Sequence, residues 1–118
     1  MWNDKRRFGG KMSNFVVIES PYAGKIQENV DYLKKCLLHS IFIENETPFA
    51  SHLFYTQVLN DEIQEERRIG IQLGYNIGDR ADYVVVYEDL GISEGMKNAI
   101  ARYKNVGKEI VYRRILSE

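Results

Sequence analysis

Short apolar runs alternate along this chain with longer stretches in which apolar residues recur at helical spacing, and this alternation constrains the fold more than any other feature. The short runs are typical of strands buried on both faces of a sheet; they are Phe15–Ile18, Tyr83–Tyr87 and Glu109–Tyr112. The helical stretches cover about residues 27–39, 61–78 and 93–105. Strands that alternate with helices favour a parallel sheet with helices on both faces. We therefore expect an α/β fold, a small Rossmann-like three-layer domain with a four- or five-stranded, mostly parallel sheet.

Length and composition indicate one globular domain. The chain has 118 residues, of which 44% are hydrophobic and 28% are charged. We expect a flexible leader at residues 1–13, which contains Gly9-Gly10 and four basic residues, and a single domain at residues 14–118. The net charge of -1 argues against binding to a nucleic acid polymer, because such binding depends on surplus Lys and Arg.

Cysteine content and hydropathy bear on the compartment. Cys36 is the one cysteine, so the chain has no internal disulfide, which fits a reducing compartment. No apolar run approaches the ~20 residues that span a bilayer, and the leader lacks the apolar core of a secretory signal. We expect a cytoplasmic protein, in the host cytoplasm if the source is viral, without membrane contact. No Cys/His spacing points to a metal, and we expect no cofactor.

The sequence pattern leaves the structure of two segments open. The run Ile41–Ile43 either continues the preceding helix or leads toward the next strand. The apolar residues of the aromatic segment Pro48–Tyr55 recur with no clear helical or strand period. A place in the wall of a site or in a subunit interface would explain why so apolar a segment occurs in a loop. Asn60-Asp61 is typical of a helix start. The four-residue spacing of Gly70, Gly74 and Gly78 predicts close packing of that helix against the sheet.

Two loops fall where ligands bind in open α/β sheets, beyond the carboxyl ends of strands. The first is Ser20–Gly24, and the second runs from Asp89 to Met96 into a helix. Free N–H groups at a helix start favour an anion there. Neither loop matches the glycine motif of dinucleotide-binding folds or the Walker motif of nucleoside triphosphate sites. The sequence therefore does not indicate a site of either kind.

The order and spacing of these segments resemble the nucleoside 2-deoxyribosyltransferase-like family. The matching segments are Ser20-Pro21-Tyr22-x-Gly24, Ala81–Val86 and the Gly-x-Ser-x-Gly-Met turn at Gly91–Met96. His52–Tyr55 and Asp89-x-Gly91 are similar to a small phage and bacterial branch, and the resemblance covers roughly residues 15–113. It implies a Rossmann-like and usually dimeric protein that cleaves or exchanges the bond between a base and 2-deoxyribose. It also implies a glutamate on the helix after the Gly/Ser turn, close to the anomeric carbon.

This chain has an alanine where the resemblance places that glutamate. The position is four residues after Gly95 and eight before Gly107, and both counts lead to Ala99. Glu94 is the acid inside the turn, but it lies about a turn and a half away, far beyond the ~1 Å tolerance of catalytic placement. Glu19, at the end of the first strand, is a better substitute; the alternative is a strand-end residue paired with Lys or Arg. We predict no catalytic residue.

The predicted ligand-binding residues come from both loops and from the histidine segment. They are Ser20, Pro21, Tyr22, Gly24, His52, Asp89, Ser93, Glu94, Gly95, Met96 and Ala99. His52 either hydrogen-bonds the ligand or is a structural histidine. Aromatic side chains are candidates for stacking a base, with packing as the alternative for the two phenylalanines; they are Tyr22, Phe49, Phe54 and Tyr55. Arg113 and Arg114 face either phosphate or solvent.

We therefore expect non-catalytic binding of a nucleotide or cyclic nucleotide. A specific form is a phage anti-defence sponge that sequesters a host immune signal, such as a cyclic ADP-ribose derivative or a cyclic oligonucleotide. The alternative is an enzyme, a nucleotide N-glycosidase or 2-deoxyribosyltransferase acting on deoxynucleoside monophosphates. A third possibility is a structural interaction module. We expect a homodimer or higher homo-oligomer with residues 48–59 at or near the interface.

Overall fold

The computed structural model describes residues 13–116 and contains one four-stranded sheet in the order β2-β1-β3-β4, with every pair parallel. The strands are β1 (Phe15–Glu19), β2 (Thr47–Phe49), β3 (Tyr83–Tyr87) and β4 (Ile110–Arg113). The helices are α1 (Ile26–Phe42), α2 (Gln64–Arg80) and α3 (Glu94–Asn105), and two short 3-10 turns, η1 (Ser51–Leu53) and η2 (Tyr55–Gln57), precede α2. The predicted leader lies outside the described residues except for Ser13.

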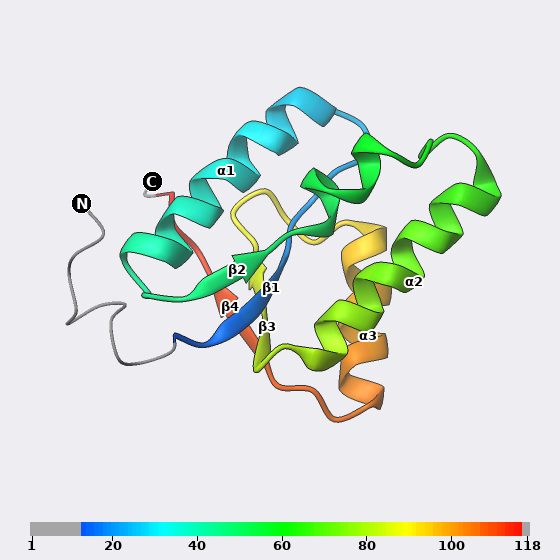
Figure 1. The fold of residues 1–118 in the computed structure, drawn as a ribbon. Coiled ribbons are helices and arrows are strands. Elements are labelled where there is room, and N and C mark those ends of the chain that lie inside the picture. The colour runs from blue at the N-terminus through cyan, green and yellow to red at the C-terminus, as the bar shows by residue number, and fades with distance from the viewer. Residues whose placement is uncertain (1–12, 117–118) are drawn as a thin grey trace.

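The helices form a layer on each face of the sheet (Figure 1). Alternate residues of β1 and β3 pack against α1 on one face, in a core with Leu33 and Cys36. On the other face, Val84 packs with Ala99 and Tyr103 of α3 and with Tyr75 of α2. The predicted three-layer, Rossmann-like α/β fold is confirmed, with four strands that are all parallel.

The strand order places a topological switch between β1 and β3. The chain leaves β1 through α1 toward β2 on one side and reaches β3 through α2 on the other. Parallel crossovers are right-handed, so the change of direction puts α1 and α2 on opposite faces. The loops after β1 and β3 therefore diverge and leave a crevice at their carboxyl ends.

Two element boundaries differ from the predicted ones. Helix α1 continues through Phe42, so the apolar run at Ile41–Ile43 mostly belongs to the helix. Helix α2 begins at Gln64 and not at Asp61, because the Asn60 side chain accepts a hydrogen bond from the Glu62 N–H at 2.9 Å and closes a turn instead.

Gly78 brings two helices together rather than a helix and the sheet. A Cβ atom built at Gly78 would lie 2.6 Å from Cζ of the buried Tyr103 ring of α3. Gly74 and Gly70 instead face Ser51 and Leu59 in the segment before α2. The prediction of close packing is confirmed, but the prediction that the sheet is the partner is wrong, because the tyrosine ring occupies that space.

Arg113 and Arg114 both face carboxylates of the protein. The Arg113 guanidinium donates to both carboxylate oxygens of buried Glu46, at 2.9 and 2.6 Å, and to the Tyr87 hydroxyl at 3.0 Å. Burial alone would raise the pKa of Glu46, but the hydrogen bonds from Arg113, Tyr83 and Ser40 hold it below its ordinary value. Arg114 lies 4.0 Å from the Glu88 carboxylate. Arg113 therefore ties β4 to the α1–β2 connection.

No helix within residues 13–116 is long and apolar enough to cross a bilayer.

Candidate functional site

A cavity of about 500 Å³ lies beyond the carboxyl end of β1, between the loop that follows it, the two 3-10 turns, α2 and the start of α3. Sites for small molecules usually have volumes of roughly 300–1,000 Å³, so this cavity has room for a nucleotide-sized ligand. It occupies the crevice that the strand order predicts, on the side of the sheet covered by α2 and α3.

Eight of the eleven predicted binding residues line this cavity. They are Ser20, Tyr22, His52, Ser93, Glu94, Gly95, Met96 and Ala99. The fold thus brings together the loop after β1, the histidine segment and the start of α3, three segments far apart in the sequence. Pro21, Gly24 and Asp89 do not line it.

Glu19 and Ser20 lie side by side on the cavity lining at the end of β1. Within the described residues, Glu19 forms no ion pair or side-chain hydrogen bond. Burial, together with the charge of Glu19, raises the pKa of Tyr75 and Tyr103. Burial raises the pKa of Glu19 to about 7. The Ser20 hydroxyl is fully buried and has no hydrogen-bond partner among the residues described. Unsatisfied buried polar groups are rare in folded proteins and call for an explanation.

The loop after β1 is fixed from behind and stacks on η1. The Asn29 amide donates to the backbone carbonyls of Tyr22 and Ala23 at 2.9 and 3.2 Å, which holds the loop in place. The Tyr22 ring then stacks on the His52 imidazole, with centroids 4.9 Å apart and planes inclined by 18°. Burial lowers the pKa of His52 below its ordinary value, so this imidazole is neutral at physiological pH. The pair forms a flat, uncharged wall.

The opposite wall is the first turn and a half of α3. Ser93 caps the helix by accepting a hydrogen bond from the Met96 N–H at 3.2 Å, and the first N–H groups of the helix lack partners within it. One turn further along the helix, Ala99 lines the cavity; the residue is 3% exposed and also packs against Val84 and Tyr103. The one carboxylate of α3 belongs to Glu94, which is exposed at the start of the helix. The helix therefore places no carboxylate beside Ala99.

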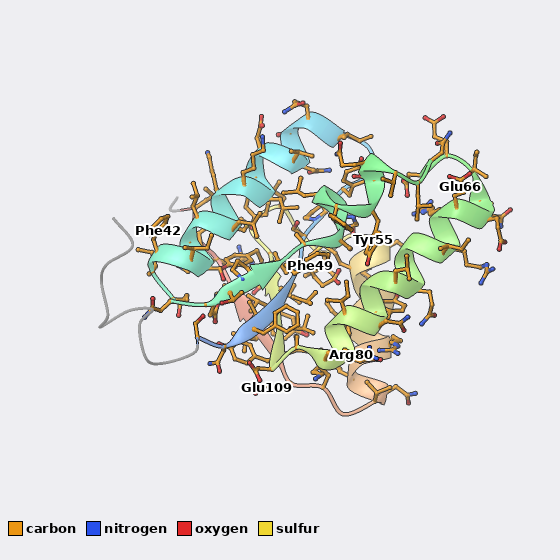
Figure 2. The ribbon with its side chains drawn as sticks, in the orientation of Figure 1. Phe42, Phe49, Tyr55, Glu66, Arg80 and Glu109 are labelled. Carbon is orange, nitrogen blue, oxygen red and sulfur yellow. The ribbon has the colours of Figure 1, made fainter. Side chains whose placement is uncertain are left out.

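Charged side chains gather at the start of α2. Asp61, Glu66 and Arg67 line the cavity there, and the Arg67 guanidinium lies 3.9 Å from the Asp61 carboxylate. Figure 2 shows Glu66 at the start of α2 and Tyr55 in the segment that precedes this helix; both residues line the cavity. With Glu19 and Glu94 included, the lining carries four carboxyl groups and one guanidinium. This balance favours a ligand with few phosphates over a polyanion.

Asp89 holds the fold together on the α1 side of the sheet. Its carboxylate accepts from the Tyr32 hydroxyl at 2.5 Å and from the backbone N–H groups of Ile115 and Leu116. Gly24 is exposed with a φ of 91°, a left-handed conformation that suits glycine and turns the chain into α1. Neither residue reaches the cavity in this structure.

A family model described as a domain of unknown function (DUF7768) matches residues 14–113, which is most of the chain. The chain belongs to this family. No curated protein and no solved structure gives a significant match to the chain. The DUF7768 match covers every strand and helix described above, and therefore the whole cavity.

The sequence prediction missed many of the residues that form the cavity wall of this DUF7768 domain. Helix α2 and the segment before it contribute residues that carried no motif; among them are Thr56, Leu59, Asp61, Glu66, Arg67, Gly70 and Tyr75. The glycine spacing in α2 was the available signal, because Gly70 and Gly74 both line the cavity. Within the described residues, no three His, Cys, Asp or Glu side chains are grouped so that they could hold a metal ion.

Proposed function

We propose that this domain binds a nucleotide or a nucleotide-derived signal in the cavity and holds it without cleaving it. The observation that carries the proposal is Ala99, which lines the cavity and is the position where the resemblance to the deoxyribosyltransferase-like family places a carboxylate. A transition state with oxocarbenium character needs a carboxylate close to the anomeric carbon. A cavity with a methyl group at that place favours retention over cleavage.

The chemistry of the walls supports a nucleotide in particular. The Tyr22–His52 pair offers a flat surface for a base, and the start of α3 offers N–H groups to a phosphate or a sugar hydroxyl. Sequestration of a signalling nucleotide by a phage protein is the specific form of this proposal. The four carboxyl groups of the lining favour a signal with few phosphates, such as a cyclic ADP-ribose derivative, over a longer cyclic oligonucleotide.

The test compares binding with turnover. The protein is incubated with deoxynucleoside monophosphates, cyclic ADP-ribose and cyclic dinucleotides, and the solution is analysed by chromatography before and after heat denaturation. We expect one of these compounds to be depleted from solution and recovered intact on denaturation. Release of free base in excess over protein would overturn the proposal, and so would the absence of binding to every compound.

A second candidate, an N-glycosidase or 2-deoxyribosyltransferase, is favoured by one observation. Glu19 is a carboxyl group in the same cavity whose pKa burial raises to about 7, as a general acid near neutral pH requires. If this candidate is right, free base accumulates with the wild-type protein. Glu19→Gln then reduces that rate by roughly 100-fold or more, the usual contribution of a general acid.

A further inference from the structure

We propose that Glu19 and Ser20 are the residues that determine base specificity, and that they recognise a base edge on which an amino group stands beside a ring nitrogen acceptor. Adenine and cytosine present this edge. The inference rests on the proposed function and adds the chemical class of the ligand.

The Glu19 and Ser20 side chains lack polar partners within the described residues. Ser20 has a buried hydroxyl without a partner, and adjacent Glu19 has no ion pair or side-chain hydrogen bond within the described residues. Both line the same cavity. A buried donor or acceptor without a partner costs about 1–3 kcal/mol. Ser20 is such a group, and Glu19 beside it is partly exposed on the same cavity lining. A ligand in the cavity would supply partners to both side chains.

Glu19 has no ion-pair partner within residues 13–116. Helices α2 and α3 cover this face of β1, and burial together with the Glu19 charge raises the pKa of the Tyr75 and Tyr103 phenols that these helices carry. The other titratable side chains on the cavity lining are Tyr22, His52, Tyr55, Asp61, Glu66, Arg67 and Glu94. Arg102 lies over both tyrosine rings and pairs with Asp79. Within residues 13–116, a negative charge on Glu19 therefore has no counter-ion in contact.

The neutral form of the Glu19 carboxyl can both donate and accept a hydrogen bond. With a pKa of about 7, the Glu19 carboxyl is protonated in a large fraction of molecules at physiological pH. A neutral carboxyl donates one hydrogen bond through its O–H and accepts one through its C=O. This matches the ring nitrogen and the amino group of adenine or cytosine. An ionised carboxylate only accepts, so it suits the adjacent N–H groups of guanine instead.

The test measures the affinities of the four deoxynucleoside monophosphates for the wild type and Glu19→Gln by titration calorimetry at about pH 6 and about pH 8. We expect the adenine and cytosine nucleotides to bind the wild type at least tenfold more tightly than the others at the lower pH. The glutamine amide mimics the neutral carboxyl at both pH values. The ratio of wild-type to variant affinity for these two nucleotides should therefore fall about tenfold between the two pH values, in step with the neutral fraction of a carboxyl of pKa about 7.

Taking the ratio to the variant cancels two other titrations, those of the ligand phosphate near pH 6 and of His52 below its ordinary range. Binding without base preference, or a ratio that does not change with pH, overturns this inference and leaves the proposed function standing. Failure of every nucleotide to bind overturns both.

Ser20→Ala supplies an independent readout. The serine hydroxyl makes no hydrogen bond in the described structure, so its removal should leave the melting temperature unchanged or slightly higher. The affinity for the adenine nucleotide should fall about tenfold. A lower melting temperature with unchanged affinity would assign Ser20 to the fold and contradict its proposed role.

Discussion

At the scale of the residue, Glu19 links the ligand site to stability. Its pKa is about 7 in the folded state and about 4.5 when unfolded, so the folded state holds the proton more tightly. The stability that this proton contributes is fully present below about pH 4.5 and is lost as pH rises through about 7. A shift of this size corresponds to about 3 kcal/mol. The side chain keeps partial exposure to the cavity, which makes this figure an upper bound.

Replacing Glu19 by glutamine should therefore stabilise the protein at alkaline pH. We expect Glu19→Gln to raise the free energy of unfolding by up to about 3 kcal/mol at pH 8 and to leave it nearly unchanged near pH 4.5. Urea unfolding at both pH values measures this. Glu109→Gln is the matched control, because Glu109 is an exposed glutamate at the edge of the sheet (Figure 2). Equal effects of the two substitutions would contradict the burial of a lone carboxyl at position 19.

At the scale of the element, the contact between α2 and α3 depends on the absence of a side chain at Gly78. A methyl group there would overlap the buried Tyr103 ring, so we expect Gly78→Ala to destabilise the protein by about 1–3 kcal/mol despite the higher helix propensity of alanine. Gly95→Ala is the control on α3, since a Cβ there meets no atom within 4 Å. Thermal unfolding of both variants measures the difference. The packing argument fails if Gly78→Ala is as stable as Gly95→Ala.

The elements also show how far sequence reasoning reaches. The run Tyr83–Tyr87 was predicted at its observed bounds, because five consecutive β-branched and aromatic residues are typical of a central strand. Strand β2 has three residues, one of them Pro48, and is too short to carry a period. The eight predicted binding residues that line the cavity lie in strand-end loops, in the histidine segment or at a helix start. The α2 wall was missed because its helix pattern looks the same whether its inner face meets a core or a cavity.

At the scale of the whole molecule, the switch in strand direction creates the crevice that the cavity occupies, and Gly70 and Gly74 of α2 line one side of it. The segment before α2 closes one side and leaves Phe54 and Val58 exposed, at 56% and 75%. The expected homodimer, with residues 48–59 at or near the interface, stays a prediction.

The most direct measurement is the affinity of wild type, Ala99→Glu and Ala101→Glu for the nucleotide that the wild type binds best. It tests whether residue 99 lies in the wall of an occupied nucleotide site. Ala101 is exposed on the same helix and does not line the cavity, so it controls for added charge. Ala99→Gln, of equal size and neutral, separates charge from bulk, and circular dichroism verifies that each variant is folded. We expect Ala99→Glu to bind at least tenfold more weakly than the wild type, and Ala101→Glu to bind as the wild type does. Unchanged affinity in folded Ala99→Glu would contradict the placement of the ligand in this cavity.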